Sequence, residues 1–385
     1  MRAYLDNSAT TPAYPEVAQL VGKLMTEEYG NASSVHHMGV LAANRIRTAS
    51  EQIASTLKVD PAEIIYTSGG TESDNMALIG VARARAYLGK HIITSAIEHP
   101  AIHETCGYLQ REGFEVTYLP VDEKGCISID DLKNAIREDT ILVSLMFVNN
   151  EIGSVMPIEE AGAVIKAANK ETYFHVDAVQ GYGKFNIRPR SMNIDLLSVS
   201  GHKIHGPKGI GFLYVKKGTK LNPINYGGGQ QKGMRSGTEN VPGVAGMALA
   251  AQMCYEDFDE KIKKLYDLKE YLVSELESRI SDIRINGPKC REGAPHIVSV
   301  SIRGLKSETV LNMLSSKEIY VSAGSACASN NPHVSDTLRS IGLDKDLLES
   351  TIRISMSLET TKEEIDYLLD TLTSQVETMR KFYRH

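Results

Sequence analysis

The chain has 385 residues, of which 42% are hydrophobic and 23% are charged, as in ordinary soluble globular proteins. The formal net charge is −6 and no basic block stands out, which gives nucleic-acid binding no electrostatic support; the apolar runs are also too short to cross a bilayer. Because the first residues lack the apolar core of a signal peptide, we predict a cytoplasmic location.

Between residues 13 and 258, segments with helical periodicity alternate with short apolar runs. The predicted helices cover residues 15–28, 39–57, 72–88, 101–112, 129–136 and 158–169. The predicted strands cover residues 64–66, 91–94, 115–119, 141–148, 173–176, 196–199 and 211–215. This alternation predicts a large α/β domain over residues 13–258, with helices on both faces of a mostly parallel sheet. Ligands of such sheets bind at the carboxyl ends of the strands.

The pattern changes after Cys254. We predict a long amphipathic helix at 257–280, a strand at 297–302, a helix at 308–314, strand-like residues at 319–322, a strand at 353–357 and a final helix at 362–383. These elements predict a small α+β domain made of residues 1–12 and 259–385.

The chain has five cysteines, and no pair of them has C-x-x-C spacing. An odd, scattered set argues against a disulfide framework and against a zinc site, so we expect no metal. The cysteines are Cys106, Cys126, Cys254, Cys290 and Cys327.

Polar residues follow several predicted strands. Gly70 and Thr71 stand at the start of a helix, where exposed N–H groups would cradle a phosphate, although an ordinary N-cap with a tight turn fits as well. His99 follows the next strand, either as a loop residue or as a ring that stacks on a cofactor and shuttles protons. Asp177 ends a third strand, either as an N-cap or as the partner of a protonated pyridine nitrogen.

Lys203 follows the apolar run 194–199 in the sequence Ser-Gly-His-Lys. A lysine there is either the first solvated residue of a loop or a desolvated amine suited to Schiff-base chemistry. Lys208 is the rival position, but it lies in a Gly/Pro turn where a solvated lysine is expected. A phosphate cradle, a stacking histidine, a buried aspartate and a reactive lysine together predict a site for pyridoxal 5′-phosphate.

With these four features, the chain resembles the fold type I pyridoxal-phosphate enzymes, their class V aminotransferase group and, more closely, the cysteine desulfurases. The opening Leu-Asp-Asn-x-Ala-Thr-Thr at 5–11 matches that group, and so does Gly-Asn-x-Ser-Ser-x-His at 30–36, where Ala32 replaces the usual proline. The resemblance covers essentially the whole chain. It implies these cofactor-binding residues: Gly70, Thr71, His99, Asn150, Asp177, Gln180, Ser200, His202, Lys203 and Thr238.

The resemblance also implies the residues that act on the substrate. Lys203 and His99 would be catalytic, and Asn150 and Arg353 would bind the substrate carboxylate. Thr238 would reach the phosphate of the other subunit, which implies a homodimer. After Arg353 the chain departs from the family pattern, because Ser357 and Leu358 stand where a glycine and a second arginine are usual.

Cys327 lies in Gly-Ser-Ala-Cys, among small and turn residues that predict a surface loop. Such a cysteine is either an incidental thiol or an available nucleophile. The match to the desulfurase loop implies that Cys327 takes sulfur from L-cysteine as a persulfide, releases L-alanine, and passes the sulfur to an acceptor protein. The acceptor would serve iron–sulfur cluster assembly or tRNA thiolation. A selenocysteine lyase, another class V aminotransferase and a non-enzymatic scaffold are the alternatives.

Overall fold

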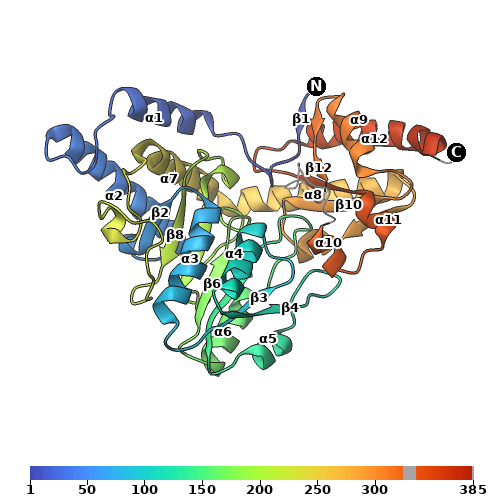
Figure 1. Ribbon diagram of the computed structural model, residues 1–385. Coiled ribbons are helices and arrows are strands. Elements are labelled where there is room, and N and C mark those ends of the chain that lie inside the picture. The colour runs from blue at the N-terminus through green and yellow to red at the C-terminus, as the bar shows by residue number, and fades with distance from the viewer. Residues whose placement is uncertain (324–334, 384–385) are drawn as a thin grey trace.

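The computed structural model describes residues 1–323 and 335–383 (Figure 1). In that part of the chain the largest sheet has seven strands in the order β2-β8-β7-β6-β5-β3-β4. Their bounds are β2 Ile64–Thr67, β3 His91–Ser95, β4 Glu115–Leu119, β5 Thr140–Met146, β6 Tyr173–Asp177, β7 Leu196–Ser200 and β8 Gly211–Val215. All neighbours pair in parallel except β8, which runs antiparallel to β2 and β7. The prediction of a mostly parallel sheet is confirmed.

Alternate residues of these strands face two different apolar layers, as the two-residue period of a strand requires. On one side, Leu142 of β5 and Leu196 of β7 join a core with helices α3 (Gly70–Arg85) and α4 (Pro100–Arg111). On the other side, Val143 and Leu197 join a larger core. Its helices include α2 (His37–Leu57), α6 (Ile158–Ala168) and α7 (Val241–Tyr255). The helices α1 (Pro15–Thr26) and α5 (Ile129–Ala135) complete this part of the chain.

The remaining strands form two small sheets. An antiparallel sheet has the order β12-β13-β10-β9, and β1 pairs in parallel with β11. The bounds are β1 Ala3–Tyr4, β9 Ile283–Asn286, β10 Ile297–Ile302, β11 Ile319–Tyr320, β12 Ser322–Ala323 and β13 Thr351–Ser355. The accompanying helices are α8 Phe258–Arg279, α9 Ser307–Ser315, α10 Asp336–Ser340, α11 Lys345–Glu349 and α12 Lys362–Tyr383. The N-terminal strand thus lies among C-terminal elements, as Figure 1 shows.

The structure differs from the local predictions in two ways. The predicted strand 319–322 is two short strands in different sheets, with Val321 between them. Helices α7, α10 and α11 and strands β1 and β9 were not predicted. Helix α7 is buried around most of its circumference, so its Ala, Gly and Met residues show no polar face and hence no helical period.

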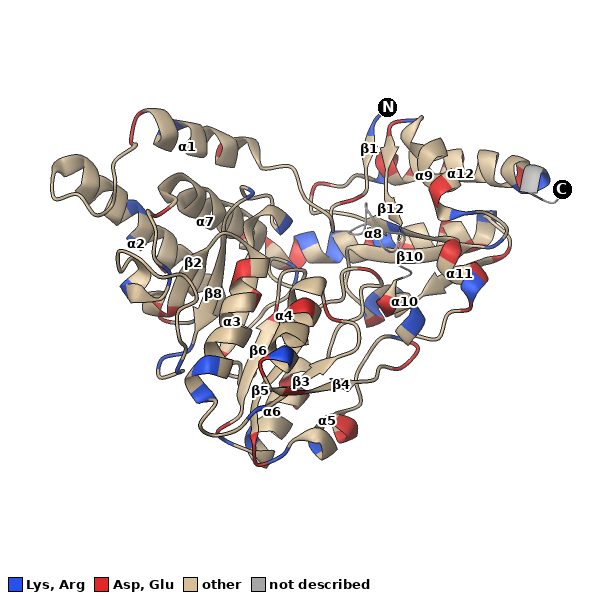
Figure 2. Cartoon of the chain, viewed as in Figure 1, with Lys and Arg blue, Asp and Glu red and all other residues tan. Residues whose placement is uncertain are grey.

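Charged residues of both signs are distributed over the helices of both parts of the molecule (Figure 2), which agrees with the modest net charge. No helix in the described residues combines the length and apolar character needed to cross a membrane. The boundaries 13–258 and 259–385 remain a prediction.

Candidate active site

A cavity of about 310 Å³ opens where the strands of the large sheet end. It is lined by ten of the residues that the sequence singled out: Gly70, Thr71, His99, Asn150, Asp177, Gln180, Ser200, His202, Lys203 and Arg353. They come from the ends of β2, β3, β6 and β7, from the segment after β5, and from β13. The carboxyl ends of parallel strands meet at one edge of a sheet, and this geometry brings together side chains that lie far apart in sequence.

Lys203 is held in a short 3₁₀ turn, Gly201–Lys203, directly after β7. Its Nζ donates hydrogen bonds to the carbonyl oxygens of Ser8 and Ala9. The Nζ of the buried Lys184 donates a hydrogen bond to the carbonyl oxygen of Lys203 at 2.8 Å. The N-terminal segment therefore folds across the sheet and fixes the direction of the lysine. Lys208 is exposed and does not line the cavity.

The same segment holds His202. Thr11 donates to the carbonyl oxygen of His202 from Oγ1 at 2.9 Å, and Thr10 Oγ1 lies 3.1 Å from His202 Nδ1. Burial and the charge of Lys203 lower the pKa of His202 to about 4, so this ring is neutral at pH 7.

Asp177 ends β6, and its Oδ1 accepts from the backbone N–H of Val179 at 2.9 Å. It thus caps a turn as well as facing the cavity. Burial raises the pKa of Asp177 to about 6, and the nearby Lys203 cation opposes that rise. A cation placed beside Asp177 would favour its ionised form further, by the same Coulombic effect.

His99 is the N-cap of α4, where its Nδ1 accepts from the N–H of Ala101 at 3.1 Å. Burial, followed by the charge of Lys203, lowers the pKa of His99 to about 4. A neutral ring that accepts at Nδ1 carries its proton on Nε2. At pH 7 His99 therefore offers a hydrogen-bond donor at Nε2.

Helix α3 starts at Gly70, and its N-cap residue Gly69 contributes no side-chain cap. The first N–H groups of a helix have no intrahelical partner and favour an anion. A Cβ built on Gly70 would lie 2.8 Å from Val179 Cγ2, so this corner of the cavity has no room for a larger residue.

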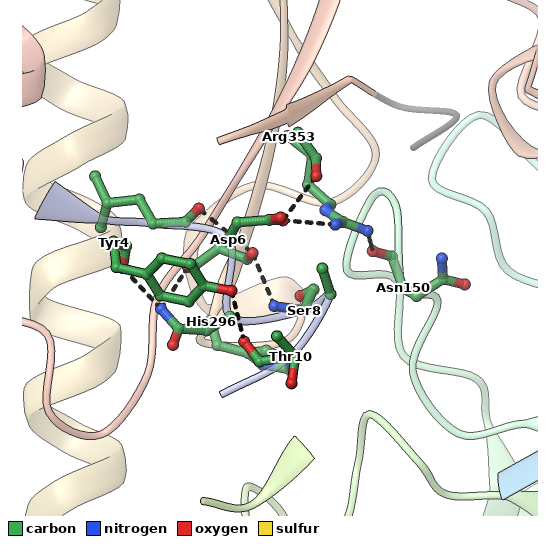
Figure 3. A network of polar contacts seen from close by, with 12 residues as sticks. Tyr4, Asp6, Ser8, Thr10, Asn150, His296 and Arg353 are labelled. Carbon is green, nitrogen blue, oxygen red and sulfur yellow. Dashed lines mark hydrogen bonds and ion pairs between the residues drawn. The ribbon is translucent and has the colours of Figure 1, made fainter. Parts of the chain in front are cut away.

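Arg353 reaches the cavity from β13, with only 4% of its side chain exposed. It donates from Nη2 to Asp6 Oδ1 at 2.8 Å and from Nη1 to the carbonyl oxygen of Asn150 at 2.9 Å (Figure 3). In the described part of the chain, its buried Nε has no hydrogen-bond partner.

Two predicted residues are not part of this cavity. Thr238 is exposed in the segment before α7, away from the lining residues. Cys327 lies outside the described residues. The described strand before it ends at Ala323, next to Ser322, which pairs with Arg353 across β12 and β13.

Sequence reasoning missed six lining residues: Ser8, Ala9, Asp74, Met146, Val148 and Val179. Asp74 lies one turn after Gly70 among the polar residues Glu72, Ser73 and Asn75, so a buried carboxylate there did not stand out in the sequence. Met146 and Val148 are apolar residues at a strand end and carry no such signal.

Comparison with known proteins places this geometry in context. The model of the family described as aminotransferase class-V matches residues 3–368. The cysteine desulfurase IscS of Dictyoglomus turgidum is 44% identical over 377 residues, which is 98% of this chain and 95% of that protein. The cysteine desulfurase IscS of Methanosarcina thermophila is 43% identical over 377 residues, 98% of this chain and 92% of that protein.

Solved structures agree with these sequences. A NifS-like protein superposes with a TM-score of 0.93 at 39% identity, covering 98% of this chain and 100% of the other. A structure described as SspA in complex with cysteine has a TM-score of 0.82 at 34% identity, covering 93% of this chain and 100% of the other.

Proposed function

The chain belongs to the aminotransferase class-V family, and we propose from that premise that it is a pyridoxal-phosphate-dependent cysteine desulfurase. The observation that carries the proposal is a single cavity that combines Lys203, Asp177, His99 and Arg353. The first three suit a pyridoxal cofactor and the fourth suits an amino-acid carboxylate.

The residues present fit pyridoxal 5′-phosphate. The uncapped N-terminus of α3 at Gly70, together with Ser200 and His202, would hold the phosphate. Asp177 would pair with the ring nitrogen, and Lys203 would bind the cofactor covalently. Three residues that line the cavity carry a buried polar atom with no hydrogen-bond partner in the described part of the chain: Ser8 Oγ, Asp74 Oδ1 and Arg353 Nε. When bound, the cofactor supplies an electron-withdrawing ring to the carbon that loses its proton.

The chain's own side chains then divide the work. Arg353 binds the carboxylate of L-cysteine through its remaining donors, and Asn150 lies beside it. Lys203 takes the α-proton, because its turn directs Nζ into the cavity. His99 offers its Nε2 proton to the cavity, and its ring would stack on the pyridoxal ring when the cofactor is bound.

Cys327 carries the sulfur step. Its thiolate attacks the substrate sulfur, so an S–S bond forms while the C–S bond of L-cysteine breaks. The electron pair stays on the three-carbon fragment, which takes up a proton and leaves as L-alanine. Three residues lie between Ala323 and Cys327, and the four Cα–Cα steps can span about 14 Å when the chain is extended. The chain therefore leaves β12 close to Arg353 with enough length to bring a thiol to the bound substrate.

The test is release of sulfide and L-alanine from L-cysteine in the presence of a thiol reductant. We expect equal amounts of both products from the parent protein and neither from Cys327→Ala, while the cofactor absorbance is kept. Cys290→Ala is the matched control, since Cys290 is a free, partly exposed cysteine, and it should retain activity. Alanine release that survives in Cys327→Ala would contradict the sulfur step.

The same assay separates the alternatives. An aminotransferase would consume an amino acid and a keto acid without sulfide and would be indifferent to Cys327→Ala. A selenocysteine lyase would release selenide from L-selenocysteine far faster than sulfide from L-cysteine. Protein that shows no cofactor absorbance after incubation with pyridoxal 5′-phosphate would point to a non-enzymatic scaffold.

We also propose a cytoplasmic homodimer in which Thr238 reaches the phosphate of the other subunit. Its exposed position, away from the cavity of its own chain, supports this role. The mass of one chain is 42.2 kDa, and light scattering should give twice that mass. Mixing inactive Lys203→Ala with Thr238→Ala subunits should give hybrid dimers that have one site with both residues intact.

The persulfide would pass to an acceptor protein for iron–sulfur cluster assembly or tRNA thiolation. The relatives named IscS support an acceptor of this kind. Transfer of labelled sulfur from Cys327 to a purified scaffold or thiolation protein, absent with Cys327→Ala, would identify which class accepts it.

A further inference from the structure

Asp6 makes direct contact with the arginine that faces the substrate. Arg353 Nη2 donates to Asp6 Oδ1 at 2.8 Å, and the same oxygen accepts from Ser322 Oγ at 2.8 Å. Figure 3 shows the guanidinium between Asp6 on one side and the carbonyl of Asn150 on the other. Arg353 lines the cavity, whereas Asp6 is not one of the lining residues.

This contact matters because the guanidinium of Arg353 is buried and needs a partner for its charge. The side chain of Arg353 is 4% exposed and that of Asp6 is 19% exposed, so water can do little to solvate either charge. A buried guanidinium needs a charged or hydrogen-bonding partner to be stable. Asp6 provides the ion-pair partner, while the carbonyl of Asn150 provides the second contact.

Geometry determines which donors are left for a ligand. A guanidinium has five N–H groups in a rigid fork. Asp6 and Asn150 occupy donors on Nη2 and Nη1, whereas the buried Nε has no partner among the described residues. These two contacts fix the plane of the guanidinium group. A carboxylate that arrives from the cavity meets donors that are already oriented, and orientation is much of what bidentate recognition requires.

The backbone holds Asp6 itself in place. Residue 6 forms an isolated bridge with Ser355, two residues beyond Arg353 on β13, and Ser322 is the cross-strand neighbour of Arg353. The carboxylate thus spans the N-terminal segment, β12 and β13, which are three pieces of chain far apart in sequence.

We propose that Asp6 is a positioning residue that orients Arg353 and so sets the preference of the site for substrates with an α-carboxylate. This rests on the proposed function only in taking amino acids as the substrate class. In the holoenzyme, Asp6→Asn keeps the size of the side chain but removes the charge that holds the fork.

The experiment compares two ligands that differ only in the carboxylate. L-alanine and ethylamine are titrated into the holoenzyme, and binding is read from the change in cofactor absorbance. In Asp6→Asn we expect the Kd of L-alanine and the KM of L-cysteine to rise about tenfold. The Kd of ethylamine and kcat should change less than threefold. Ser322→Ala removes the other donor to the same oxygen and should change the L-alanine Kd by less than threefold.

An unchanged ratio of ethylamine to L-alanine affinity in Asp6→Asn would overturn the proposal, and so would an equal loss for both ligands. If Asp6→Asn fails to hold the cofactor, Asp6→Glu decides, because it keeps the charge but moves it by one methylene. A parental ratio in that variant would also refute the role. Because neither ligand has sulfur, the ratio remains measurable if no sulfide is ever released, in which case only the desulfurase proposal fails.

Discussion

His175 offers a quantitative test of the polar network beneath the cavity. Its ring is completely buried in β6, with Nδ1 2.8 Å from Ser144 Oγ and Nε2 2.9 Å from Ser198 Oγ. The carboxyl group of Asp74 lies 3.7 Å from Nε2. Burial lowers the pKa of His175 to about 3, while burial and the nearby Asp177 raise that of Asp74 and weaken the counter-charge it offers. The ring is therefore neutral in the folded protein at pH 7.

The effect on stability follows from proton binding. An unfolded histidine has a pKa near 6.5, so between pH 6.5 and about 3 the unfolded chain binds a proton at residue 175 that the folded protein does not. Stability is then lost as pH falls, at about 1.4 kcal/mol for each pH unit. From pH 6.5 to pH 4 the loss from this one residue is about 3 kcal/mol.

His175→Asn removes this contribution. The variant should be less stable than the parent at pH 7, because the ring's packing and one of its hydrogen bonds are lost. The difference in the free energy of unfolding between parent and variant should then shrink by about 3 kcal/mol as pH falls to 4. Urea unfolding of the cofactor-free proteins at pH 7, 6, 5 and 4 measures it. His37→Asn, at an exposed histidine, provides the control for replacing a histidine as such.

A difference between parent and His175→Asn that stays constant across this pH range would refute the reasoning. It would mean that the folded protein takes up the proton at His175 without penalty, which the buried position and the two serine contacts argue against.

Three further substitutions have defined outcomes. Gly70→Ala would place a methyl group 2.8 Å from Val179 Cγ2, so the amount of pyridoxal 5′-phosphate retained after desalting should fall while the circular dichroism spectrum is unchanged. Asp177→Asn should lower alanine release by about a hundredfold, measured with the cofactor absorbance as the loading control, because the ring nitrogen loses its counter-charge. Lys269→Met should raise the free energy of unfolding at pH 7 by about 1–2 kcal/mol, because burial lowers the pKa of Lys269 to about 8 and its Nζ donates to a carbonyl oxygen, that of Ala294, rather than to a carboxylate. Between about pH 8 and pH 10.5 the unfolded chain holds a proton on Lys269 that the folded parent has lost, so the parent gains stability as pH rises. The variant should lack this gain, and urea unfolding over that pH range measures it.

Local sequence signals located the strand ends well. Thr67, Ser95, Asp177 and Ser200 end their strands within a residue or so of the predicted positions, because apolar runs followed by polar and turn residues mark such boundaries directly. Once the strands are taken as parallel, their carboxyl ends must meet, and the gathering of His99, Asp177 and Lys203 follows from topology alone.

The hydrogen-bond partners of Lys203, in contrast, could not be predicted from the sequence. Its acceptors are the backbone carbonyl oxygens of Ser8 and Ala9, and every residue has such a carbonyl, whatever its side chain. No residue type marks these two contacts, in which Lys203 meets residues that precede it by 195 and 194 positions. Asp6 and Arg353 carry distinctive opposite charges, but they are 347 residues apart, and their pairing depends on how the N-terminal segment lies beside β13.

This contrast has a functional consequence. The groups that perform chemistry are side chains of distinctive type, so each can be identified in the sequence, as Lys203 and Asp177 were. The groups that orient Lys203, the carbonyls of Ser8 and Ala9, act through position alone. A substitution at Ser8 or Ala9 that keeps the backbone path should therefore leave the direction of Lys203 intact. A change that shifts the path, such as a deletion between residues 5 and 11, should misdirect the lysine although every catalytic side chain is still present.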